Sequence, residues 1–263
     1  GKRGAYAPVH PNDHVNMAQS TNDTFPSAMR LAILFELPAL LGSLRRCSAT
    51  LQELGARFRR TIKSARTHLQ DAVPLTLGQE FSGYAVTVRR AAARVEESAR
   101  SLRRLSLGAT AAGTGLNAHP AYAARVARVL SRDTGIALRP AANLVEAAMS
   151  TADFAAFSAS LRGLALDLGK IANDLRLLAS GPLTGLAEIR LPAVQPGSSI
   201  MPGKVNPSVP EMVNQVCFQV MGCDQTVAIA CEAGQLELNV MMPVIAWNAL
   251  HASTILRAAM TVF

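Results

Sequence analysis

The chain has 263 residues, of which 49% are hydrophobic and 17% are charged. This length and composition allow a folded protein with a sizeable buried core and exclude a disordered chain. Aromatic residues make up only 5% of the chain, and its abundant alanine and leucine favour helices over sheet, so we predict an all-α fold.

The net charge of +8 is carried mainly by arginine pairs within helical patterns. Solvated helix faces explain these pairs better than a nucleic-acid surface, because no aromatic residues are interleaved with the charges. A positive field would instead attract a small dianion. We therefore expect no nucleic-acid partner.

The four cysteines of the chain show neither CxxC spacing nor the density of a secreted disulfide scaffold. Because each lies among apolar helical residues, we expect buried thiols in a reducing compartment. The sequence shows no signal-peptide pattern and no obvious apolar run of about 20 residues, the length that spans a bilayer. We predict a cytoplasmic protein with no membrane partner and no metal or other cofactor.

Apolar residues recur at alternating spacings of four and three along four segments, which predicts heptad seams on long helices. A seam of about 25 residues corresponds to a rod of roughly 40 Å. We predict a long-helix bundle, with Pro38 kinking its first helix and with some apolar surface covered by other subunits. The seams are Ile33, Leu37, Leu40, Leu44, Cys47, Leu51, Leu54 and Phe58; Leu77, Phe81, Tyr84, Val88, Ala91 and Val95, followed by Leu102 and Leu105; Phe154, Phe157, Leu161, Leu164, Leu168, Ile171, Leu175 and Leu178; and Val213, Val216, Val220, Cys223 and Val227.

Segments rich in Gly, Pro, Asn, Ser and Thr separate the predicted helices, and we interpret them as loops that carry the chemistry. We expect residues 1–26 to end an N-terminal domain and residues 27–263 to form the central helical domain. Because the chain begins without Met and closes within an apolar helical pattern, we expect a piece of a longer protein. The predicted loops are residues 4–26, 61–74, 106–120, 180–208 and 231–243.

The segment Gly197-Ser198-Ser199-Ile200-Met201-Pro202-Gly203-Lys204-Val205-Asn206-Pro207 is the strongest chemical motif of the chain. Its small residues allow a backbone to approach a ligand. Lys204 offers a charge to a carboxylate, and Asn206 offers a directional amide. We call residues 195–208 the signature loop.

The signature loop closely resembles that of the aspartase and class II fumarase superfamily. Three further segments resemble the same family, so the resemblance covers nearly the whole chain. These segments are His10-Pro11-Asn12-Asp13-His14-Val15-Asn16 with Gln19-Ser20-Thr21-Asn22-Asp23, Arg66-Thr67-His68-Leu69-Gln70-Asp71-Ala72 with Leu77-Gly78-Gln79-Glu80-Phe81, and Gly113-Thr114-Gly115-Leu116-Asn117.

The resemblance implies a homotetramer in which different subunits contribute to each active site, and a small dicarboxylate as substrate. It makes Ser198 the base that removes a proton from the carbon beside a carboxylate, and it pairs His68 with Glu211. It implies that the chain lacks the family's N-terminal part and C-terminal small domain. By this resemblance the catalytic residues are Ser198, His68 and Glu211, and the substrate-binding residues are Ser20, Thr21, Asn22, Thr67, Ser199, Lys204 and Asn206.

The flanking segments bear on which lyase the chain is. Fumarase is resembled by Thr67–Ala72 and Phe81–Tyr84. Aspartase is resembled by Lys170–Pro182, Gly185–Ile189, Leu191–Pro192, Pro210–Gln215 and Glu232–Val240. We predict that L-aspartate is converted reversibly to fumarate and ammonia. A class II fumarase and a noncatalytic structural relative remain the alternatives, and Leu183 and Met242 depart from the expected pattern.

Overall fold

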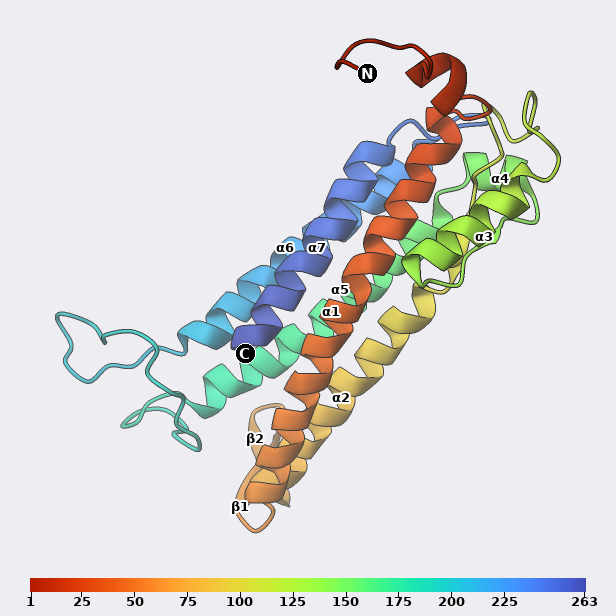
Figure 1. Cartoon of the computed structure of the whole chain (residues 1–263). Coiled ribbons are helices and arrows are strands. Elements are labelled where there is room, and N and C mark those ends of the chain that lie inside the picture. Colours follow the sequence, from red (N-terminus) through yellow and green to blue (C-terminus); the bar gives the residue numbers. More distant parts are fainter. The chain divides into compact units, whose positions relative to one another are not determined.

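The computed structural model describes residues 1–263, which form two compact units. Unit 1 comprises residues 1–35, 98–157 and 226–250, and unit 2 comprises residues 36–97, 158–225 and 251–263. Long helices dominate the chain (Figure 1), and the prediction of an all-α, long-helix fold is confirmed. The long helices are α1 (Thr21–Arg57), α2 (Leu77–Ser98), α5 (Ala152–Leu178), α6 (Ser208–Glu232) and α7 (Met242–Val262).

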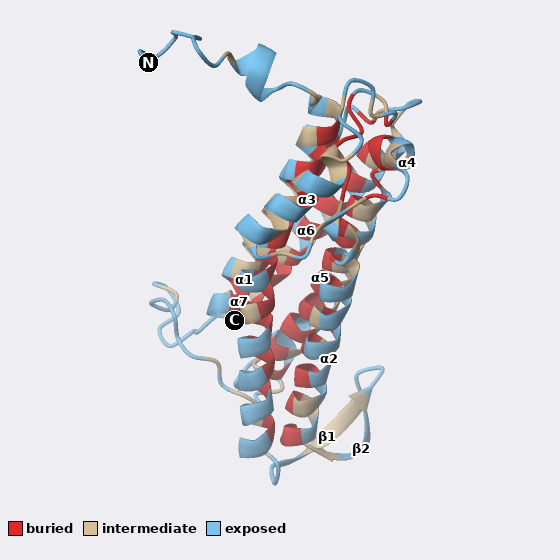
Figure 2. Cartoon of the chain, turned by 45° about the vertical axis from the view of Figure 1, so that its right-hand side comes forward, coloured by how far each residue is buried: buried red, intermediate tan, exposed pale blue.

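The predicted seams are the buried stripes of these helices (Figure 2). Every seam residue on α2 and on α5 is buried, and so is the α1 seam as far as Leu51. Leu54 and Phe58, at the end of the α1 seam, are half-buried, and Cys217 replaces Val216 as a fully buried residue of α6. Spacing alone therefore located the core of four helices.

The fifth long helix, α7, was not among the predicted seams. Half of its buried residues are alanine or serine, and large apolar residues such as Val244 and Trp247 are exposed, so the sequence shows little contrast between a buried and an exposed side. The estimate of four long helices was wrong for this reason. The buried residues of α7 include Ile245, Ala249, Ala252, Leu256 and Ala259.

In unit 2, polar contacts bridge the helices around the apolar seams. Ser48 of α1 donates to the carbonyl of Ala85 on α2 at 2.9 Å. Gly78 lets α2 approach the end of α1, since a Cβ there would lie 2.4 Å from the carbonyl oxygen of Gly55. Asn214 of α6 donates to the carbonyl of Gly169 on α5 at 3.2 Å. These contacts join α1 to α2 and α6 to α5.

Unit 1 holds the short elements: α3 (Tyr122–Thr134), α4 (Leu144–Met149) and a two-residue parallel pair, β3 (Arg104–Leu105) with β4 (Arg139–Pro140). Within this unit, Arg30 of α1 is almost fully buried and donates to Asp153 at 2.7 Å. Burial lowers the pKa of Arg30, although Asp153 opposes that shift. The buried pair therefore joins α1 to the first turn of α5.

Two of the predicted loops contain regular structure. Residues 61–74 were expected to be a loop, but they form most of an antiparallel hairpin of β1 (Ile62–Thr67) and β2 (Gln70–Thr76). Backbone pairing across a short turn satisfies polar groups that a loop would leave to water. Within residues 4–26, a single π-type turn covers Pro11–Val15, and α1 already begins at Thr21. The proposed domain boundary at residue 26 falls inside this helix and stays a prediction.

By length and composition alone, α1 could cross a membrane, contrary to our reading of the sequence. This is weak support for a membrane helix, because half of its most apolar stretch is buried within the chain, as in a core helix. All four cysteines are free thiols, three of them buried. Burial raises the pKa of Cys47 and of Cys217 to about 11, so these thiols stay protonated at neutral pH.

Candidate active site

The first group of predicted site residues lies at the start of α1, in unit 1. Ser20 accepts a hydrogen bond from the backbone N–H of Asn22 at 3.1 Å, which caps the helix. Asn22 donates its side-chain amide to the carbonyl of Ala111 at 2.8 Å. The side chain of Thr21 is exposed. The hydroxyl protons of Ser20 and Thr21 and the amide oxygen of Asn22 are available to a ligand.

Asp23 anchors this group, although the sequence reading gave it no role. Its side chain is fully buried and accepts three backbone N–H groups, from Ser20 at 3.0 Å, Gly108 at 3.0 Å and Thr110 at 2.9 Å. The bond to Ser20 is half of a capping box, and the other two tie α1 to the loop that precedes Gly113. The signal was present in the sequence, because an acid three residues after a serine predicts this cap.

The second group, Thr67 and His68, lies at the tip of the β1–β2 hairpin in unit 2. Thr67 pairs with Gln70, so the turn consists of His68 and Leu69 alone. Both turn residues have positive φ, 54° and 60°, as a two-residue turn of type I′ requires. That conformation is costly for residues other than glycine, and such strain is concentrated at functional sites. Thr67 and His68 are exposed.

The third group lies on the signature loop, also in unit 2. A Cβ on Gly197 would lie 2.5 Å from the carbonyl oxygen of Lys204, so glycine is needed for the loop to close on itself. This closure brings the backbone just before Ser198 close to the backbone of Lys204. Gln195 also donates to Ser208 at 2.9 Å across the base of the loop. The two contacts bring the two ends of the loop together.

The side chains of the signature loop face solvent. Ser198 is half-buried, and Ser199, Lys204 and Asn206 are exposed. A cavity of about 150 Å³ lies beside Asn206, but its walls are mainly apolar side chains such as Leu175 and Val194. Such walls give a dianion no compensating hydrogen bonds. The cavity alone is thus unsuited to a dicarboxylate.

Glu211 lies in the first turn of α6, where a carboxylate suits the positive end of the helix. Its carboxylate lies 4.0 Å from the guanidinium of Arg176, and no hydrogen bond or ion pair joins it to His68. The predicted pair of His68 and Glu211 stays a prediction. Within unit 2, the hairpin tip, the signature loop and Glu211 are three separate groups.

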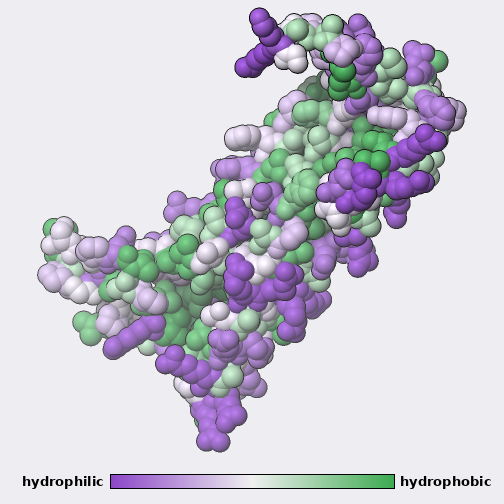
Figure 3. Space-filling view, viewed as in Figure 1, coloured by the Kyte–Doolittle hydropathy of each residue, from purple (hydrophilic) through white to green (hydrophobic).

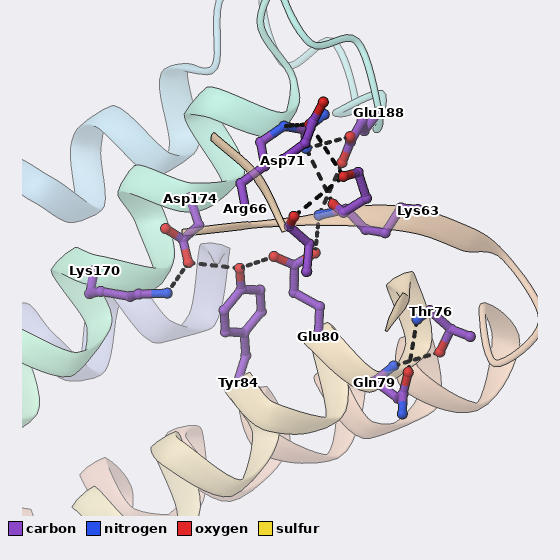
Figure 4. Close-up of polar contacts among 12 residues, drawn as sticks. Lys63, Arg66, Asp71, Thr76, Gln79, Glu80, Tyr84, Lys170, Asp174 and Glu188 are labelled. Atoms are coloured by element: carbon purple, nitrogen blue, oxygen red, sulfur yellow. Dashed lines mark hydrogen bonds and ion pairs between the residues drawn. The ribbon is translucent and has the colours of Figure 1, made fainter. Parts of the chain in front are cut away.

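A chain of charged residues fixes the hairpin in unit 2 (Figure 4). Lys63 of β1 contacts Glu80 of α2 at 2.7 Å and Glu188, in the segment after α5, at 3.0 Å. Tyr84 donates to Asp174 of α5 at 2.7 Å. Burial, followed by the hydrogen bond and charge of Asp174, raises the pKa of Tyr84, so the phenol stays neutral.

Comparison with known proteins places these motifs in a family. The sequence model described as "Lyase" matches residues 2–222. Aspartate ammonia-lyase of Helicobacter pylori strain 26695 is 49% identical over 258 residues, covering 98% of this chain and 55% of that protein. Fumarate hydratase class II of Thermosynechococcus vestitus is 51% identical over 260 residues, covering 98% of this chain and 56% of that protein. The chain spans about half the length of these relatives.

The fold agrees with the sequence comparison. The crystal structure of fumarate lyase:delta crystallin from Brucella melitensis bound to cobalt superposes with a TM-score of 0.96 at 55% identity. The match covers 98% of this chain and 56% of that one. The sequence motifs, the family match and the shared fold together show that the chain belongs to the lyase family, the aspartase and class II fumarase superfamily that its signature loop resembles.

Proposed function

We propose that the protein eliminates ammonia reversibly from L-aspartate to give fumarate. The observation that carries the proposal is the signature loop, in which closure at Gly197 brings the segment of Ser198 against Lys204. Relatives named aspartate ammonia-lyase, 49% identical over nearly the whole chain, support this reading. The segments around Lys170–Pro192 and Glu232–Val240 resemble aspartase and favour ammonia as the leaving group.

The proposed reaction begins with proton transfer from the carbon beside a substrate carboxylate to Ser198. The electrons of the broken C–H bond pass into that carboxylate, which becomes a dianion. Lys204 and Asn206 stabilise the dianion by charge and by hydrogen bonding. The C–N bond then breaks, its electrons leave with ammonia, and the C=C bond of fumarate forms. Serine acts as a base only where donors and cations lower its pKa, so the site must close around it.

The other predicted groups hold the substrate. Ser20, Thr21 and Asn22 offer hydroxyl and amide groups to the second carboxylate, and Thr67 and His68 approach from the hairpin. Ser199, next to the base, offers one more hydroxyl. We propose that these segments meet when copies of the chain associate, and that His68 then pairs with Glu211. We propose no cofactor, because the residues described supply the base and the charges.

We propose a homotetramer in the cytoplasm. Apolar side chains reach the visible surface among hydrophilic ones (Figure 3). The exposed aromatic residues of the chain include Phe218 of α6, 64% exposed, and Trp247 of α7, 69% exposed. Exposed aromatic residues of this size are typical of contact surfaces. The free cysteines favour a reducing compartment. Light scattering of the purified protein should give four times the chain mass, and a monomer would contradict the shared site.

The proposed activity is tested by following fumarate through its ultraviolet absorbance. The complete gene product is given L-aspartate and, in a parallel reaction, L-malate. We expect fumarate from L-aspartate alone. The second candidate, a class II fumarase, is favoured by the relative from Thermosynechococcus vestitus and predicts fumarate from L-malate. No fumarate from either substrate would indicate a relative that keeps the fold and has lost the reaction.

A further inference from the structure

Glu188 lies where two cations of β1 converge (Figure 4). Its carboxylate contacts the ammonium of Lys63 at 3.0 Å and the guanidinium of Arg66 at 2.6 Å. The side chain of Lys63 is only 9% exposed, and that of Glu188 only 18%. Largely buried ion pairs are screened far less by water than surface pairs are. Removing Glu188 would leave two neighbouring cations short of a counter-charge.

The backbone around Glu188 is itself fixed to the end of α5. The N–H of Glu188 donates to the carbonyl of Leu178 at 2.9 Å, and the N–H of Ala187 donates to that of Ser180 at 2.8 Å. The side chain of Ser180 accepts a further N–H, from Leu186, at 3.0 Å. Glu188 is thus a fixed point on the helical bundle of unit 2, and it is not a mobile surface carboxylate.

The hairpin tip depends on such a fixed point. Arg66 directly precedes Thr67, and the side chains of Thr67 and His68 are exposed. Arg66 also approaches Asp71 of β2, but at 4.0 Å and with an exposed carboxylate. The contact between Arg66 and Glu188 is therefore the strong side-chain tie nearest the tip. The contact between Lys63 and Glu80 fixes the opposite end of β1.

We propose that Glu188 is a positioning residue of the active site, which holds Arg66 and Lys63 so that the adjoining Thr67 and His68 meet the substrate. This inference rests on the proposed lyase function. It adds Glu188 to the residues that the reaction requires, although Glu188 does not contact the substrate. Glu188 acts on the hairpin before the substrate arrives, because its contacts lie within the chain. The conformational entropy of the hairpin tip is then lost when the protein folds. Less entropy is therefore lost when the substrate binds.

The test is the variant Glu188→Gln, which keeps the shape of the side chain and removes its charge. Hydrogen–deuterium exchange of residues 62–76 should be at least about tenfold faster than in the native protein, with α2 and α5 unchanged. The KM for L-aspartate should rise about tenfold. A purely structural loss of folded protein would lower the apparent kcat at constant KM, so the two effects are distinguishable.

A matched control removes another ion pair of the same unit. Asp167 of α5 contacts Arg94 of α2 at 2.5 Å, well away in sequence from the hairpin and its partners. Asp167→Asn should leave both hairpin exchange and KM at native values. Glu188→Asp, which retains the charge on a shorter side chain, should recover part of the native KM.

Two results would overturn the proposal. Unchanged hairpin exchange in Glu188→Gln would show that Glu188 does not hold the hairpin. Faster hairpin exchange in Glu188→Gln with native kcat and KM would show that the reaction does not require Glu188 to fix the hairpin tip. If the native protein turns over neither L-aspartate nor L-malate, the proposed function fails, and the positioning role fails with it. The exchange data then still decide separately whether Glu188 fixes the hairpin.

Discussion

The hairpin and the signature loop both carry predicted site residues in unit 2, and they are held in different ways. The hairpin has a backbone ladder and is tied to neighbouring elements through Lys63, Arg66 and Glu188. The signature loop is tied chiefly to itself, through the close approach of Gly197 to Lys204 and the bond between Gln195 and Ser208. No hydrogen bond or ion pair joins the hairpin tip to the signature loop.

This difference indicates that the hairpin and the signature loop have different roles. A hairpin fixed by charges can present Thr67 and His68 in one geometry before substrate binds. A loop with exposed side chains can close over a substrate and exclude water, as catalytic loops commonly do. The role proposed for Ser198 requires such closure, because a serine is a base only in an environment that stabilises its alkoxide.

Ser198→Ala should have the largest effect. It removes the proposed base without altering a buried contact, so turnover of L-aspartate should fall on the order of 10³-fold or more, as when a catalytic nucleophile or base is lost. Light scattering and thermal unfolding should stay native. Ser199→Ala is the matched control, with an expected loss of about tenfold or less. Near-native turnover in Ser198→Ala would contradict the proposal that the signature loop supplies the base.

Lys204→Met should reduce kcat by roughly 10²- to 10³-fold, the usual cost of removing one stabilising donor from a developing anion. Methionine keeps the length and apolar stem of lysine while removing the charge. Steady-state kinetics with L-aspartate provide the measurement. A rise in KM with native kcat would mean that Lys204 binds substrate and transition state equally.

Gly197→Ala tests whether the self-contact of the signature loop matters. Its new Cβ would lie 2.5 Å from the carbonyl oxygen of Lys204, so the loop must open, and we expect a loss of about tenfold in kcat/KM. The control is Gly83→Ala on α2, where the added methyl group meets nothing within 4 Å. That control should keep native activity and gain up to about 1 kcal/mol in stability. Equal activity in the two variants would contradict the structural role of Gly197.

The pH dependence of hairpin exchange should show the smallest effect. Burial opposes the charged form of Glu188, but hydrogen bonds and charge from Lys63 and Arg66 outweigh burial and lower its pKa below the ordinary 4.5. The folded state is therefore stabilised above about pH 4.5, and this stabilisation is lost as the pH falls through the lowered pKa. Glu80 also faces Lys63, from α2.

We expect the protection of residues 62–76 against exchange, taken relative to the intrinsic amide rate at each pH, to fall a few-fold on acidification below pH 4.5, before the helices of unit 2 lose protection. The pKa of Lys63 is raised, because hydrogen bonds to Glu80 and Glu188 outweigh the effect of burial. Its contribution therefore persists through neutral pH and is lost only in strong alkali. Hairpin protection that falls on acidification in the native protein but stays constant in Glu188→Gln would assign the effect to Glu188.

Much of the fold was predictable because heptad spacing reports burial directly, as the fully buried seams of α2 and α5 show. The buried stripe of α7 was not recognised, because half of it is alanine or serine and large apolar residues such as Trp247 are exposed on the same helix. The β1–β2 hairpin resembled a loop because its residues are largely polar. The motifs could indicate Ser198 and His68 as site residues. They could not indicate Glu188, since its role depends on cations more than 120 positions earlier in the chain.

The central claim is that hairpin and signature loop, separate in one chain, serve a single active site between copies. Mixing two inactive variants, His68→Asn and Ser198→Ala, and reassembling them tests it most directly. Each variant alone should be inactive with L-aspartate, and the mixed assembly should recover part of the native rate, because some sites then receive a native hairpin from one copy and a native loop from another. A mass measurement of the assemblies shows whether both variants are present in one assembly. If such mixed assemblies form and recover no activity, a shared site is contradicted.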